Sequence, residues 1–195
     1  MTLIVGIDKN INAKDIKIIA GDRMASNGFT KTYKGEDDKK IFIRDKYAFG
    51  CTSSMRMRQI LKYEPLPTYD TGEKHDWSEE KLLYTSFPDW VRKSLKDKGF
   101  AKVVNNEETG GNFLFYNGKN MYEIQSDFSL LGSEDGLYAV GSGEYHALGI
   151  MRAYIKMAED KKTKFDLQYL LDMIYQITSY NVVSVSEKYD YIELS

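Results

Sequence analysis

Residues 1–7, MTLIVGI, and residues 16–22, IKIIAGD, decide how the chain is expected to fold. Both segments are short, apolar and rich in β-branched residues, and the more polar residues 9–15 between them are typical of the turn of an antiparallel hairpin. Neither segment alternates polar and apolar residues, which indicates strands that are covered on both faces. The pair therefore predicts the centre of a layered α/β arrangement.

Thr2 stands at the start of the first strand, directly after Met1. If an aminopeptidase removes Met1, Thr2 carries a hydroxyl and a free α-amine, so this nucleophile has its own base. The reference pKa of an α-amine is roughly 8, so an appreciable fraction is neutral near pH 7 and can accept the hydroxyl proton. A threonine after an initiator methionine is common, and this interpretation needs support from the rest of the chain.

Length and composition predict one domain over residues 1–195, large enough to bury a core without disulfides or metals. The net charge of −2 argues against nucleic acid or an anionic membrane surface as the main partner. Cys51 is the single cysteine and is expected in the core, and the two histidines lie far apart, so the common zinc spacings are absent. Without a signal peptide or a run of eighteen apolar residues, we expect a cytoplasmic protein with no membrane span and no bound metal.

The middle of the chain predicts a second hairpin followed by helices. Residues 41–43 and 47–51 are its expected strands, and the hydroxyls of residues 52–54 are expected to cap a helix over 55–62. Residues 63–77 contain two prolines among polar residues and predict a long loop, the place most suited to an insertion.

Ser78 is expected to cap the next helix, with Trp77 and Leu82 in contact across its first turn. That helix would continue to about residue 98. Pro88 either kinks it or divides it, with Ser86 as the cap of the second part.

The last part of the chain predicts alternating strands and helices. Strands are expected over 112–116, 121–125 and 137–140, with Asn117 and Gly118 in the turn between the first two. Helices follow over 144–160 and from the N-cap Asp166 onward, with Phe165 and Leu170 in contact across the cap. Strands over 182–185 and 189–194 would close the chain.

An ordered set of motifs resembles the proteasome β-subunit family, and within it the HslV-type bacterial peptidase subunits. The motifs are Thr2, Gly21-Asp22, Lys39-Lys40-Ile41, Val140-Gly141-Ser142-Gly143 and the closing Ile192-Glu193-Leu194-Ser195. The resemblance spans essentially the whole chain. It implies an N-terminal nucleophile hydrolase with an α+β fold, in which a single domain forms a four-layer αββα sandwich.

The resemblance also implies roles for individual residues. Thr2 would be the nucleophile, and Lys40 would lie beside it, where a positive charge lowers the pKa of the hydroxyl and keeps the amine neutral. Lys39 is the alternative if the alignment shifts by one residue. Asp22 would pair with the lysine, because a buried ammonium needs a carboxylate to stay charged. Ser142, on a turn between two glycines, would help to organise the threonine.

The chain departs from the family pattern in two places. The oxyanion-binding amide usually comes from a glycine pair, and Ser53 and Ser54 stand there instead. Their backbone N–H groups can still bind an oxyanion, but the added side chains would narrow the substrate site. Residues 178–181 stand where classical proteasome subunits have an Asp and Ser pair, and HslV-type subunits also differ there.

By this resemblance the chain is a threonine-type endopeptidase subunit that forms stacked homo-oligomeric rings around a chamber. An AAA+ ATPase would deliver unfolded polypeptide substrates to it. No cofactor is expected, although the family pattern also allows a monovalent cation bound by carbonyls near residues 178–181. Two alternatives remain, because a fold does not fix a substrate: an inactive ring or scaffold protein, and an N-terminal nucleophile amidase acting on a small amide.

Overall fold

The computed structural model describes residues 2–26, 31–33, 35, 38–105, 107–161 and 163–195. Their centre is a four-stranded sheet in which the two strands of the predicted first hairpin are neighbours. Its strands, in spatial order, are β12 (Leu137–Gly141), β1 (Leu3–Ile11), β2 (Lys14–Asp22) and β13 (Tyr189–Glu193). All three pairings are antiparallel, so the predicted hairpin and the predicted closing strand are confirmed.

A second, five-stranded sheet contains the predicted hairpins of the middle of the chain. Its strands, in spatial order, are β11 (Leu130–Leu131), β10 (Met121–Ile124), β9 (Phe113–Tyr116), β6 (Tyr47–Cys51) and β5 (Ile41–Arg44). Two short hairpins that the sequence did not predict complete the described strands. They are formed by β3 (Met24–Ser26) with β4 (Lys31–Tyr33) and by β7 (Lys102–Val104) with β8 (Glu107–Thr109).

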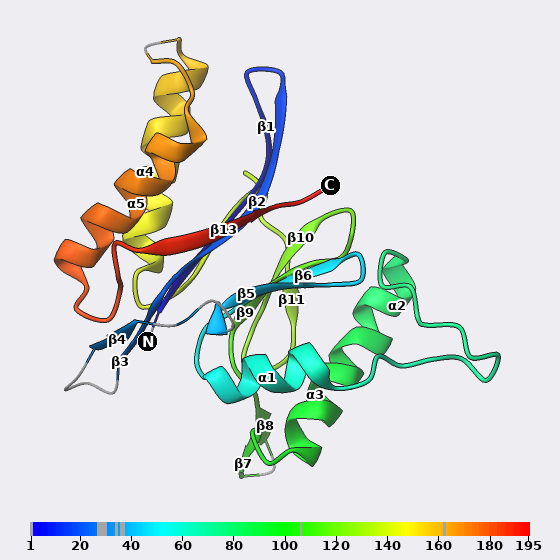
Figure 1. Ribbon diagram of the computed structural model, residues 1–195. Coiled ribbons are helices and arrows are strands. Elements are labelled where there is room, and N and C mark those ends of the chain that lie inside the picture. Colours follow the sequence, from blue (N-terminus) through cyan, green and yellow to red (C-terminus); the bar gives the residue numbers. More distant parts are fainter. Residues whose placement is uncertain (1, 27–30, 34, 36–37, 106, 162) are drawn as a thin grey trace.

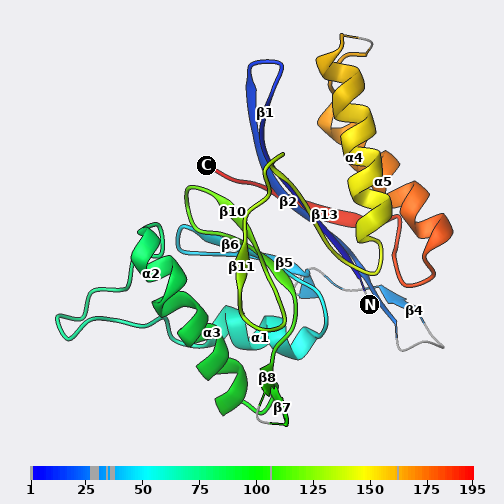
Figure 2. The same cartoon turned by 180° about the vertical axis from the view of Figure 1, so that it is seen from behind.

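Helices lie on opposite sides of the two sheets, as Figures 1 and 2 show from front and back. The first sheet carries α4 (Glu144–Glu159) and α5 (Leu167–Asn181), while α1 (Met55–Tyr63), α2 (Glu80–Tyr84) and α3 (Ser86–Asp97) lie against the second. The chain thus forms one domain of mixed helix and sheet, as predicted.

Strand β1 is covered on both faces, which is why its apolar run does not alternate. Leu3, Val5 and Ile7 are fully buried against the apolar faces of α4 and α5. Ile4 is also fully buried, but it belongs to the cluster that fills the space between the sheets. Burial of each such side chain stabilises the fold by about 1.5–3 kcal/mol, so the head of β1 is held rigidly from two sides.

The turn of the first hairpin is shorter than expected. Residues 9–15 were predicted as the turn, but the ladder continues until Ile11 pairs with Lys14. Only Asn12 and Ala13 turn the chain, with φ angles of 51° and 64°. Two successive residues with positive φ favour the tight turn that matches the twist of paired strands. The prediction of a seven-residue turn was wrong because polar residues near a hairpin tip can continue the strands.

Helix starts in the middle of the chain were partly predicted. The side chain of Ser54 caps α1 by accepting a hydrogen bond from the amide of Arg56, as expected from the hydroxyl-rich residues before it. Ser78 does not cap α2, whose N-cap is Glu79. The Ser78 amide instead donates to a carboxylate oxygen of Asp76 at 2.9 Å, so a local turn competes with the expected cap.

The second helical segment is divided, which was one of the two predicted alternatives. Thr85 separates α2 from α3, and Ser86 is the first residue of α3 and not its cap. Pro88 lies in the first turn of α3, where a missing N–H breaks no helical hydrogen bond. Of the predicted loop over 63–77, Tyr63 is the last residue of α1, and residues 64–77 include no described helix or strand apart from a bridge between Thr68 and Lys74.

The closing segment has one confirmed and one wrong prediction. Asp166 caps α5 by accepting from the amide of Tyr169. The strand expected over 182–185 is absent, since Val182 is the C-cap of α5 and the amide of Val185 donates back to its carbonyl at 3.0 Å. Within the described residues, no helix has both the length and the apolar character that a membrane crossing needs.

Candidate active site

Thr2 lies at the head of β1 and only 4% of it is exposed. Its carbonyl accepts a hydrogen bond from the amide of Ser142 at 2.9 Å. Gly141, at the end of β12, has a φ of 107°, and a Cβ placed on it would lie 2.2 Å from the Thr2 carbonyl oxygen. Only glycine fits such a backbone approach, so the turn after β12 fixes Thr2 by close contact. Met1, whose removal would expose the Thr2 amine, lies outside the described residues.

The Thr2 side chain is hydrogen-bonded to both Asp22 and Lys40. Its hydroxyl donates to Asp22 Oδ1 and accepts from the ammonium of Lys40. Lys40 Nζ also lies 2.8 Å from Asp22 Oδ1, and all three side chains are buried. The structure therefore brings together three of the predicted catalytic residues, from positions 2, 22 and 40.

Backbone groups fix the carboxylate and the ammonium of this cluster. Asp22 Oδ1 accepts from the amide of Leu3 at 2.8 Å, and Oδ2 accepts from the amide of Met24 at 3.1 Å. Lys40 Nζ donates to the carbonyl of Met24 at 2.5 Å. Removing two charges from water is costly unless each is paired and hydrogen-bonded, and both conditions are met here.

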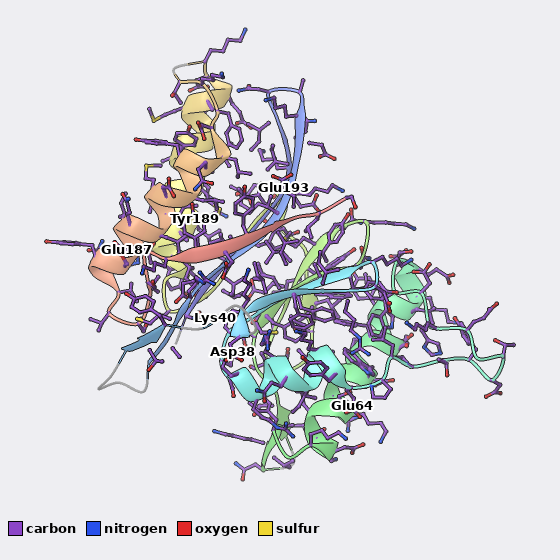
Figure 3. The ribbon with its side chains drawn as sticks, viewed as in Figure 1. Asp38, Lys40, Glu64, Glu187, Tyr189 and Glu193 are labelled. Atoms are coloured by element: carbon purple, nitrogen blue, oxygen red, sulfur yellow. The ribbon has the colours of Figure 1, made fainter. Side chains whose placement is uncertain are left out.

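The two lysines of the charged run have different environments. Figure 3 labels Lys40 where the two sheets meet, just before β5. Lys39 points elsewhere, with Nζ 3.4 Å from Asp190 Oδ1 on β13. Lys40 is therefore the lysine beside Thr2, and the alternative alignment through Lys39 is not the arrangement in the structure.

Ser142 connects Thr2 to a residue that sequence reasoning missed. Its hydroxyl lies 3.3 Å from the Thr2 carbonyl oxygen and 2.8 Å from the hydroxyl of Ser184. Ser184 lies in the turn after α5, beyond residues 178–181 where the departure from the family was expected. A serine just past the end of the last helix was the available signal, but the predicted strand over 182–185 concealed it.

Ser53 and Ser54 differ in how their amides are used. The Ser54 amide donates to the carbonyl of Thr52 at 2.5 Å, whereas among the described residues the Ser53 amide has no acceptor. Ser53 has a φ of 50°, in the left-handed region that favours glycine. Its side chain lies against Gly111, where an added Cβ would be 2.8 Å from Ser53 Oγ. Of the two predicted oxyanion donors, Ser53 has the available amide.

A cavity of about 150 Å³ adjoins this cluster and is lined by Thr2, Lys40, β3 and the residues that connect β6 to α1. Cys51 is on its wall and is 3% exposed. Burial raises the pKa of the Cys51 thiol to about 12, and the charge of Arg58 only partly opposes this effect. The thiol is therefore neutral near pH 7 and is not an activated nucleophile.

The described residues contain no group of three or more His, Cys, Asp and Glu side chains arranged to hold a metal ion. In and next to the region where the family pattern allows a monovalent cation, two carbonyls of α5 accept hydrogen bonds. The carbonyl of Thr178 accepts from the amide of Val182, and that of Ile177 accepts from the side chain of Asn181. The absence of a cofactor stays a prediction.

Comparison with known proteins shows the fold and no close relative. No family model matches the chain, and no curated protein matches its sequence. Among solved structures, the chain is similar to BPH of Thiobacillus denitrificans, with a TM-score of 0.75, 16% identity and coverage of 100% of this chain and 99% of that one. A second structure of this BPH, in complex with epoxomicin, has a TM-score of 0.73 and 17% identity, with complete coverage of both chains.

Two further structures have the same fold. HslV from Trypanosoma brucei has a TM-score of 0.64 and 17% identity, with 100% of this chain and 99% of that chain covered. A mutant of Anbu from Hyphomicrobium sp. strain MC1 has a TM-score of 0.63 and 13% identity over 100% of this chain and 82% of that chain. The predicted resemblance to proteasome-type N-terminal nucleophile peptidases is thus confirmed as a likeness of fold over the full chain.

Proposed function

We propose that the protein is a threonine-type endopeptidase subunit whose nucleophile is Thr2, exposed when Met1 is removed. Its layers of helix, sheet, sheet and helix correspond in this proposal to the αββα sandwich of N-terminal nucleophile hydrolases. The observation that carries the proposal is the buried cluster in which the Thr2 hydroxyl bonds to both Lys40 and Asp22.

In the first half of the reaction, Thr2 Oγ1 attacks the carbonyl carbon of the scissile peptide bond. The α-amine of Thr2 takes the hydroxyl proton, and the ammonium of Lys40 stabilises negative charge on the oxygen. The Ser53 amide donates to the oxyanion of the tetrahedral intermediate. The C–N bond then breaks, the proton passes from the Thr2 amine to the leaving amine, and an ester on Thr2 remains.

In the second half, water hydrolyses this ester. The Thr2 amine accepts a proton from the attacking water, and the hydroxide adds to the ester carbonyl carbon. Collapse of the second tetrahedral intermediate breaks the C–O bond and returns the proton to Thr2 Oγ1. Asp22 takes no proton in either half, because its role is to keep Lys40 charged and oriented.

The cost of the buried ion pair favours an enzyme over an inactive scaffold. A buried pair of charges adds little net stability compared with apolar side chains of the same volume. Asp22 and Lys40 are buried near the apolar cluster between the two sheets. An inactive scaffold could have apolar side chains at both positions. A catalytic role of the Thr2 hydroxyl accounts for the placement of both charged side chains beside it.

Assembly and partners belong to the same proposal. The likeness to a structure named HslV supports stacked rings of identical subunits, fed with unfolded polypeptide by an AAA+ ATPase, in the cytoplasm. Light scattering on the purified chain tests the ring. A monomer under all conditions would contradict assembly into a ring-shaped protease. The alternative of an amidase acting on small amides would then remain.

Covalent labelling tests the nucleophile directly. A peptidyl epoxyketone presents two electrophilic carbons, so it bonds stably to a residue that offers both a hydroxyl and a free amine. Intact mass should show loss of Met1, followed by addition of one whole inhibitor molecule, and peptide mapping should place it on Thr2. Epoxomicin is a suitable first reagent, since the similar BPH structure is in complex with it.

Matched variants separate the proposal from an inactive scaffold. Thr2→Ala should abolish labelling and peptidase activity, and Lys40→Ala should lower both by at least about a hundredfold, as losing an electrostatic stabiliser does. Lys39→Ala is the control, since Lys39 bonds to Asp190 and not to Thr2, and it should retain activity. Equal labelling of wild type and Thr2→Ala would refute the proposal, as would full activity in Lys40→Ala.

A further inference from the structure

The cavity beside Thr2 has walls of mainly apolar character. Besides Thr2 and Lys40 it is lined by Met24, Ala25, Cys51, Thr52, Ser53, Ser54 and Met55. Thr2 and Ser53 supply the nucleophile and the oxyanion amide of the proposed reaction. Because the cavity adjoins both groups, we assign it to the side chain of the residue whose carbonyl carbon Thr2 attacks.

The charged groups of the cavity lining disfavour a substrate residue with an ionised side chain. The described residues of the lining include no carboxylate, so an arginine or lysine of the substrate would lose its hydration without gaining a counter-charge from them. Among the described lining residues Lys40 is the one charged side chain, and its ammonium is already bonded to Asp22, Thr2 and the Met24 carbonyl. A substrate carboxylate would have to compete with Asp22 for it.

Volume limits what enters. The volume of about 150 Å³ is close to that which holds one benzene-sized molecule. Side chains of up to four carbons fit within this limit, whereas an indole ring exceeds it. The Cys51 thiol adds no charge, since its pKa of about 12 keeps it neutral.

Resting on the proposed function, we infer that this cavity selects a compact aliphatic residue, such as alanine, valine or leucine, on the acyl side of the scissile bond. Met55 is the residue that sets the size limit. It is the first residue of α1, is partly exposed and lines the cavity with a side chain that no described hydrogen bond fixes. Shortening it enlarges the cavity without removing a core side chain of the sheets.

The experiment uses the full chain after Met1 removal and a set of fluorogenic peptides that differ only in the residue before the scissile bond. We expect kcat/KM for leucine and valine to exceed that for tryptophan and lysine by at least about tenfold, the range that one mismatched apolar group produces. Met55→Ala should raise the ratio of tryptophan to leucine turnover at least about fivefold.

Two control variants guard against indirect effects. Met55→Leu has a similar volume and should keep the wild-type preference. Met157→Ala removes a methionine that is 47% exposed on α4, outside the cavity lining, and should also keep it.

Each outcome decides something different. Equal turnover of all peptides, or a preference for tryptophan or lysine, overturns the specificity and leaves the threonine peptidase standing. An unchanged preference in Met55→Ala overturns the assignment of this cavity as the selecting one. If no peptide is cleaved and no epoxyketone labels Thr2, the proposed function fails, and the specificity fails with it.

Discussion

Two strand-to-helix turns flank Thr2, and they solve the same steric problem in opposite ways. The turn from β12 to α4 uses Gly141, whose backbone lies directly against the Thr2 carbonyl. The turn from β6 to α1 uses Ser53, which has a positive φ in spite of its side chain. Space for that side chain comes from the chain opposite, at Gly111. Glycine is thus required where two backbone segments touch, as at Gly141. Where a side chain such as that of Ser53 needs space, the glycine can instead stand at the position that this side chain contacts, here Gly111.

The largest expected effect is that of Gly141→Ala. The added Cβ would lie 2.2 Å from the Thr2 carbonyl oxygen, and alanine is strained at a φ of 107°. We expect destabilisation of at least about 2 kcal/mol in chemical denaturation, with loss of measurable peptidase activity. The control is Gly149→Ala on α4, where an added Cβ meets nothing and the helix should gain about 0.5–1 kcal/mol. Equal stability of the two variants would show that the close backbone contact does not require glycine at position 141.

A smaller effect is expected for Gly111→Ala. Its Cβ would meet Met57 Sδ at 2.7 Å and Ser53 Oγ at 2.8 Å, and both are side-chain atoms that can move. We expect a loss of about 1–2 kcal/mol. Adding Ser53→Gly should recover part of that loss, which a double-mutant cycle measures as coupling between the two positions. Strict additivity would show that Gly111 does not provide space for Ser53.

Ser142→Ala tests the β12 turn without changing its backbone. The variant keeps the amide that donates to Thr2 and loses the hydroxyl that contacts the Thr2 carbonyl and Ser184. One hydrogen bond contributes about 1 kcal/mol, so kcat should fall by roughly five- to tenfold while stability changes by less than about 1 kcal/mol. Ser184→Ala should lower kcat less. If the double variant is much worse than Ser142→Ala alone, the two hydroxyls do not act through one contact.

The smallest effect is expected for Ser53→Gly. Glycine relieves the strain of a positive φ but increases the entropy of the unfolded chain, and these terms nearly cancel, to within about 0.5 kcal/mol. The amide assigned to the oxyanion remains, so kcat should change by less than about threefold. A tenfold loss of kcat would show that the Ser53 hydroxyl itself contacts the reacting group.

Much of the fold could be predicted because strong local patterns decide it. The apolar runs of β1 and β2 and the cap at Asp166 are physical signals contained in a few neighbouring residues. The two-residue turn at Asn12 and Ala13 was missed because polar side chains do not reveal where a ladder ends. The cap expected at Ser78 was wrong because α2 begins at Glu80, with Glu79 as its N-cap, and Ser78 belongs to a local turn with Asp76.

The candidate site was predictable only with the family resemblance. Nothing local marks Lys40 within a charged run, and its contact with Thr2 depends on how two separate sheets meet. Ser184 was missed for the same reason, since it reaches Ser142 from a turn 42 residues away in the chain. Cys51 lies in the core at the end of β6, as its apolar neighbours indicated.

The ion pair of Asp22 and Lys40 joins two sheets that are built from different parts of the chain. Asp22 ends a strand of one sheet and Lys40 immediately precedes a strand of the other. The first sheet alone can place Asp22 beside the Thr2 hydroxyl, but the ammonium of Lys40 comes only with the second sheet. In the proposed peptidase, the three side chains that act at the scissile bond would therefore come together only when both sheets have packed against each other.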